Sequence, residues 1–134
     1  MDGKEPDTSE GEKRYRVLLV EDNAIISELM AELLEGLNCT VSIASDGQEA
    51  VEVVSTGEWD IVLMDVFMRG LNGIEATRLI KRNKSLQHLP IVGLTGAGDE
   101  LQQCLDAGMV EVLVKPVGED ELARCLKEWC EEAL

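Results

Sequence analysis

Four short apolar runs in the chain each end abruptly at a polar residue. The runs are Val17–Val20 before Glu21 and Asp22, Ile61–Met64 before Asp65, Ile91–Leu94 before Thr95, and Val112–Val114 before Lys115. Short runs rich in Val, Ile and Leu are typical of strands that are buried on both faces of a parallel sheet. The pattern therefore predicts strands over about 16–21, 59–65, 91–94 and 111–114.

A fifth run, residues 40–44, alternates polar and apolar side chains, as expected for a strand at the edge of a sheet. Between the runs, apolar residues recur at helical spacing, and Asn23 is placed to cap the first such segment. Helices are predicted over about 24–37, 47–56, 73–83, 98–107 and from 119 onward. Alternating strands and helices predict an α/β fold, a doubly wound sheet of five parallel strands in the order 2-1-3-4-5.

The length of 134 residues suits one domain that buries a substantial core. Residues 1–13 mix Gly, Pro, Ser and charged side chains, a composition that does not offset the entropy lost on ordering. We therefore predict a disordered acidic tail over residues 1–13 and a single domain over residues 14–134.

The chain is strongly acidic, with 12 Lys and Arg residues against 27 Asp and Glu and a formal net charge of −15. This charge repels nucleic acid and anionic membranes, and no basic run offsets it. No apolar stretch approaches the roughly 18 residues that span a bilayer, and the N-terminus lacks the pattern of a signal peptide. We expect a cytoplasmic protein without nucleic-acid or membrane partners.

Four cysteines lie singly within hydrophobic patterns and show no CxxC spacing: Cys39, Cys104, Cys125 and Cys130. The chain has one histidine, His88, in a polar loop, so a zinc ligand set is not indicated. We predict reduced core cysteines, with Cys130 the most exposed of the four.

The polar residues that end the strands should meet, because the carboxyl ends of parallel strands share one edge of a sheet. Carboxylates held this close repel each other unless a cation joins them. Glu21, Asp22 and Asp65 with one backbone carbonyl suit an incomplete Mg²⁺ shell whose remaining positions take water or phosphoryl oxygens. Lys115 adds a positive charge and Thr95 a hydroxyl, so the predicted chemistry is phosphoryl transfer to a carboxylate.

The segments LLVEDN, LMDVFM, GLTG and LVKP, in this order and at these spacings, resemble the receiver domain of two-component response regulators over about residues 15–132. The resemblance implies a flavodoxin-like (βα)5 fold that accepts a phosphoryl group from a histidine kinase or a histidine phosphotransfer protein. It implies that Asp65 is the phosphoacceptor. It also implies that Glu21, Asp22, Asp65 and the backbone carbonyl of Phe67 bind Mg²⁺ or Mn²⁺.

The same resemblance implies roles for the ends of the last two strands. Thr95 resembles the hydroxyl that moves toward the phosphoryl group, with Gly96 after it, and Lys115 resembles the lysine that pairs with that group. The Lys115–Pro116 peptide resembles one that is often cis. The implied output is a downstream protein bound to the face formed by the helix at about 98–107, the strand at 111–114 and the last helix.

The chain departs from the family pattern at three positions that bear on signalling. Val112 stands where an aromatic switch residue is common, and Gly96 stands where Ala is common. Arg69 stands where Pro is common, with its role left open between site and solvent. Phe67 and Ala97 occupy the positions that tune dephosphorylation in the family. Neither side chain orients a water for in-line attack, so slow self-dephosphorylation is predicted.

Three other functions compete with a phosphorylated signalling module. Val112 and Arg69 favour a pseudo-receiver that is a protein-binding scaffold without phosphorylation, whereas the complete Glu21, Asp22, Asp65, Thr95 and Lys115 set opposes it. A magnesium phosphatase usually has a second Asp two residues after its nucleophile, where this chain has Phe67. A flavin protein of this fold needs Ser or Thr after the first strand, where this chain has Asn23 and Ala24. We therefore expect a protein that is not an enzyme beyond its own phosphorylation and slow dephosphorylation.

Overall fold

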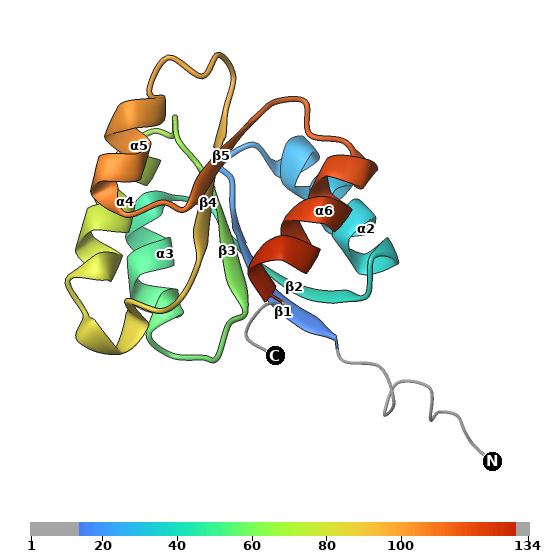
Figure 1. The fold of residues 1–134 in the computed structure, drawn as a ribbon, viewed down its shortest axis with the longest axis horizontal. Helices are drawn as coiled ribbons and strands as arrows, with labels where there is room; N and C mark the ends of the chain where they lie inside the picture. The colour runs from blue at the N-terminus through green and yellow to red at the C-terminus, as the bar shows by residue number, and fades with distance from the viewer. Residues whose placement is uncertain (1–13, 131–134) are drawn as a thin grey trace.

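A parallel sheet of five strands forms the middle layer of the protein (Figure 1). A computed structural model of the protein describes residues 14–130. The strands are β1 (Tyr15–Val20), β2 (Cys39–Ala44), β3 (Ile61–Asp65), β4 (Ile91–Thr95) and β5 (Glu111–Val114). Their order is β2-β1-β3-β4-β5, so the predicted topology and the edge position of β2 are confirmed. The tail predicted over residues 1–13 lies outside the described residues.

Helices cover both faces of this sheet, as the predicted doubly wound fold requires. They are α2 (Ala24–Gly36), α3 (Gly47–Val54), α4 (Gly73–Lys81), α5 (Leu101–Ala107) and α6 (Glu119–Cys130), with a short 3₁₀ helix η1 (Lys84–Leu86). In Figure 1, α2 and α6 lie on one side of the sheet and α3, α4 and α5 on the other. No helix among the described residues is long and apolar enough to cross a membrane.

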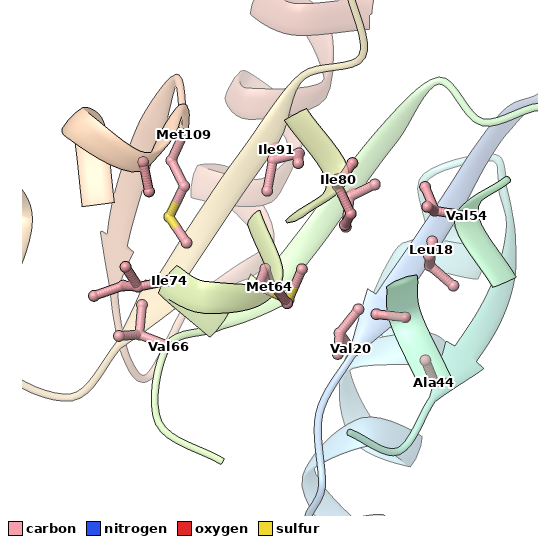
Figure 2. Close-up of a cluster of buried hydrophobic side chains, with 14 of the residues drawn as sticks. Leu18, Val20, Ala44, Val54, Met64, Val66, Ile74, Ile80, Ile91 and Met109 are labelled. Atoms are coloured by element: carbon pink, nitrogen blue, oxygen red, sulfur yellow. The ribbon is translucent and has the colours of Figure 1, made fainter. Parts of the chain in front are cut away.

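Two hydrophobic cores result from the alternation of side chains along each strand. On β1, Leu18 and Val20 belong to one core, whereas Val17 and Leu19 belong to the other. Figure 2 shows part of the core under α3, α4 and α5, including Leu18 and other strand side chains. Val17–Val20 of β1 are buried on both faces of the sheet, and this part of the strand is continuously apolar, which is why the run could be recognised as a central strand.

Local polar groups determine where the helices begin. The Asn23 side chain accepts hydrogen bonds from the amides of Ile25 and Ile26, each at 3.0 Å, so the predicted cap of α2 is confirmed. Asn72 and Glu75 form a capping box at α4, which was not predicted from the sequence. The starts of helices α2 and α4 are therefore fixed next to the loops that follow β1 and β3.

The structure corrects several predicted boundaries. Strand β3 begins at Ile61 instead of 59, because the Asp60 side chain accepts a hydrogen bond from the Arg16 amide at 2.8 Å just before the strand begins. Helix α5 begins at Leu101 instead of 98, since Gly98 has a φ of 81°, which is not helical. The 3₁₀ helix η1 was not predicted.

All four cysteines are free and buried, as predicted for core residues. Cys130 is the most exposed of the four, as predicted, but at 8% exposure it still belongs to the core between α2, α6 and the sheet. Cys130 packs inward since it continues the apolar stripe of α6 that includes Leu122 and Leu126.

Candidate functional site

Three carboxylates meet at the carboxyl edge of the sheet. Glu21 and Asp22 follow β1 directly, and Asp65 is the last residue of β3, the strand next to β1. One carboxylate oxygen from each of the three residues lies within 4.8 Å of the other two. The sequence-predicted acidic residues are therefore brought together by the pairing of two strands that are about 40 residues apart in the chain.

Two of these carboxylates are almost completely buried. Glu21 and Asp65 are each 3% exposed. The backbone amide of Asn23 donates to Glu21 Oε2 at 3.2 Å, and the amide of Phe67 donates to Asp65 Oδ1 at 3.4 Å. Burial raises the pKa of Asp65 to about 6, and repulsion by Glu21 adds to this rise, although Lys115 opposes it. A carboxylate whose charge is this unfavourable is stabilised by any added cation.

Lys115 supplies the positive charge at this site. Its Nζ lies 3.1 Å from Asp65 Oδ1 and 3.1 Å from Glu21 Oε1. Burial favours the neutral amine, but the hydrogen bonds and charges of Asp65 and Glu21 outweigh burial and raise the pKa of Lys115. The Lys115–Pro116 peptide is cis, as predicted, and the Lys115 amide donates to the Thr95 carbonyl at 2.7 Å. The ammonium is thus fixed between the two carboxylates.

Thr95 ends β4 and is 1% exposed. Its hydroxyl accepts a weak hydrogen bond from the Ala97 amide at 3.5 Å and donates to Glu100 Oε1 at 3.3 Å. Gly96 and Ala97 are near the surface, and a Cβ at Gly96 would meet no atom within 4 Å. Glu100 was not identified from the sequence, because the predicted helix boundary placed this residue inside a helix and not before one.

The loop after β3 also contacts the site. Phe67 is 58% exposed. The Arg69 amide donates to Asp22 Oδ2 at 3.3 Å, and Arg69 Nε lies 4.0 Å from the same oxygen. Because the Arg69 side chain is 95% exposed, its charge contributes little in water, and the residue lies at the rim of the site. Val112 is partly buried and packs against the core under α3, α4 and α5.

A glycine that was not singled out from the sequence determines how closely the next helix approaches the site. Gly73, the first residue of α4, donates from its amide to the Val66 carbonyl at 3.0 Å. A Cβ at this position would overlap the backbone carbonyl of Asp65. Only glycine allows α4 to begin against the end of β3, and the sequence signal for this was limited to the predicted helix start.

These residues form a buried acidic cluster with an ammonium and a hydroxyl at the switch point of a doubly wound sheet, the chemistry of a site for a divalent cation and a phosphoryl group. The model of the response regulator receiver domain family matches residues 17–127. The chain therefore belongs to this family, whose members are signalling modules of two-component systems and phosphorelays.

Curated proteins and solved structures agree with this assignment. The sensor histidine kinase GacS of Pseudomonas protegens is 35% identical over an alignment of 135 positions that covers 97% of this chain and 15% of that protein. The receiver domain of the sensor histidine kinase PA1611 of Pseudomonas aeruginosa PAO1, solved with magnesium in its active-site cleft, has a TM-score of 0.84 and 33% identity, covering 89% of this chain and 99% of that one. A third similar structure is the receiver domain of Ssk1 of Saccharomyces cerevisiae, which was solved with the histidine phosphotransfer protein Ypd1. It has a TM-score of 0.82 and 29% identity, and the match covers 90% of this chain and 92% of that one.

The chain spans between 15% and 20% of the length of the first three curated relatives. The resemblance therefore concerns the receiver domain of these proteins.

Proposed function

We propose that the protein is a phosphoacceptor signalling module in which Asp65 receives a phosphoryl group from a phosphohistidine. The observation that carries this proposal is the buried Asp65 carboxylate with Lys115 Nζ 3.1 Å from it and two further carboxylates beside it. An Asp65 oxygen forms a bond to phosphorus as the P–N bond breaks. The leaving imidazole keeps that electron pair and is stabilised by a proton on the ring.

The donor set fits the metal that the family implies. Glu21, Asp22, Asp65 and the Phe67 carbonyl would hold Mg²⁺ or Mn²⁺, which supplies charge neutralisation for the phosphoryl oxygens when bound. The chain's own residues do the rest. Lys115 neutralises the phosphoryl oxygens, Thr95 donates a hydrogen bond to one of them, and the amide of Phe67 keeps the Asp65 carboxylate oriented for attack.

An apolar groove next to the site supports a protein as the phosphoryl donor. The groove lies between α2 and the segment after β5 and is lined by Ile26, Leu29, Met30, Leu33, Pro116 and Val117, with Lys115 at its edge. Because Lys115 belongs to both the groove and the site, a protein seated in the groove brings its phosphohistidine close to Asp65. The proposed occupant is the phosphohistidine domain of a histidine kinase or of a histidine phosphotransfer protein.

The proposed output surface is the face of α5, β5 and α6, where a downstream protein would bind. Leu101, Leu105 and Val114 on this face are exposed apolar side chains. Phe67 and Ala97 offer no acid or amide to align a water, which supports slow self-dephosphorylation. The extent of the domain over residues 14–134 and the cytoplasmic location stay predictions.

A pseudo-receiver that binds proteins without phosphorylation is the second candidate. The observation that favours it is Val112, because an aliphatic side chain packed against the core cannot turn inward as an aromatic switch residue does. Beryllofluoride with Mg²⁺ distinguishes the two functions, since it stands in for a phosphoryl group on a carboxylate. A change in the amide NMR spectrum that is lost in Asp65→Asn supports the phosphoacceptor, and an unchanged wild-type spectrum supports the scaffold.

A further inference from the structure

The hydroxyl of Thr95 has a specific acceptor in this structure. Thr95 is 1% exposed, so its hydroxyl needs a partner within the protein. That partner is Glu100, whose Oε1 lies 3.3 Å from Thr95 Oγ1. Glu100 is also the residue that precedes α5, and its side chain makes no capping hydrogen bond to the helix. The Glu100 carboxylate therefore accepts its hydrogen bond from Thr95 and not from the helix, although Glu100 stands at the N-cap position of α5.

A threonine hydroxyl has one hydrogen to donate. The same hydrogen cannot be given to Glu100 and to a phosphoryl oxygen on Asp65. We propose that Glu100 is a positioning residue that holds the Thr95 hydroxyl in the unphosphorylated protein, and that a phosphoryl group at Asp65 takes this hydroxyl from Glu100. This inference rests on the proposed function, because it assigns Thr95 as the group that binds the phosphoryl oxygen.

The segment between the two residues suits such an exchange. A Cβ added at Gly96 would meet no atom within 4 Å, so this part of the loop is not packed against the protein. Gly98 has a φ of 81°, a conformation that other residues rarely adopt. Once Thr95 turns away, the Glu100 carboxylate is released at the start of α5. The signal thus reaches the α5 side of the output face without an aromatic residue at position 112.

The test measures the apparent dissociation constant for beryllofluoride at fixed Mg²⁺, followed by amide NMR. Removing the competing acceptor in Glu100→Ala raises the population of the binding-competent state, and we expect roughly tenfold tighter binding. Glu100→Gln keeps a neutral acceptor oxygen, so its dissociation constant for beryllofluoride is expected to lie between those of Glu100→Ala and the wild type. The matched control is Asp99→Ala, which removes the same charge one residue earlier, from an exposed side chain. This control is expected to change the constant less than about twofold.

The decisive comparison places Glu100→Ala in a Thr95→Val background. Without the hydroxyl, loss of Glu100 is expected to leave the beryllofluoride constant unchanged. Equal tightening with and without the Thr95 hydroxyl would overturn the inference, because it would reveal a charge effect alone. Unchanged binding in Glu100→Ala with the wild-type Thr95 would overturn it as well.

A ligand-free measurement separates this inference from the proposed function. The folding equilibrium constants of the wild type, Thr95→Val, Glu100→Ala and the double variant form a cycle, and we expect a coupling of roughly fivefold between the two residues. If the wild type does not respond to beryllofluoride but the coupling is present, the proposed function fails while the hydrogen bond is upheld. Absence of coupling refutes the role of Glu100 whatever the response to beryllofluoride.

Discussion

Replacing Asp65 by Asn is expected to stabilise the metal-free protein at neutral pH. Burial, together with repulsion by Glu21, raises the pKa of Asp65 from 3.8 to about 6 even though Lys115 attracts the carboxylate. The ionised carboxylate is therefore less favourable in the folded chain than in the unfolded chain. The difference between 3.8 and about 6 corresponds to roughly 3 kcal/mol of unfolding free energy at pH 7.5.

The pH dependence follows from the sign of this difference. Because the folded-state pKa lies above the unfolded value, the protonated acid favours folding fully below about pH 4, and this advantage is lost as the pH rises through about 6. Urea unfolding in EDTA from pH 4.5 to 8 measures it. The stability gained in Asp65→Asn should be about 1 kcal/mol at pH 4.5 and reach roughly 3 kcal/mol at pH 7.5.

Two comparisons make this result specific. Asp99→Asn, at an exposed position, should change stability by less than about 0.5 kcal/mol at every pH. Saturating Mg²⁺ should stabilise the wild type more than Asp65→Asn, so the difference in unfolding free energy between the two proteins should become smaller. The reasoning is refuted if Asp65→Asn is less stable than the wild type at pH 7.5, since attraction by Lys115 would then outweigh burial.

Three further outcomes are expected. Gly73→Ala should destabilise the protein by about 2 kcal/mol or more in thermal unfolding, because its Cβ overlaps the backbone next to the site, whereas Gly36→Ala, with no atom near its Cβ, should be neutral or stabilising. Leu29→Ser should slow transfer from a phosphohistidine protein but not from acetyl phosphate, and Leu101→Ser on α5 should slow neither; equal effects on both donors would contradict the role of the groove. The phosphorylated protein should lose its phosphoryl group slowly, and Phe67→Asn should shorten its lifetime; a half-life of seconds in the purified wild type would be contrary to expectation.

The fold was predictable because its central strands are buried on both faces. Continuous apolar runs such as Val17–Val20 identify such strands, and the alternating run at 40–44 identified one of the two edge strands, β2. Boundaries that depend on backbone geometry were less predictable. The start of α5 depends on the positive φ of Gly98, and residue type does not determine which glycines adopt it.

The site was predictable to the extent that it depends on strand ends. Strand pairing alone places Asp65 next to Glu21 and Asp22, and the structure brings these residues together with Lys115. Glu100 was not predictable, because its contact with Thr95 depends on the path of the loop that joins β4 to α5.

The most direct test of the account is the intact mass of the protein after incubation with a phosphorylated histidine phosphotransfer protein or acetyl phosphate, with and without Mg²⁺. The wild type is expected to gain one phosphoryl group when Mg²⁺ is present, and Asp65→Asn is expected to gain none. Asp60→Asn, which changes an acidic residue just before the opposite end of β3, is expected to keep the gain. No gain with either donor, or a gain that persists in Asp65→Asn, would contradict Asp65 as the phosphoacceptor.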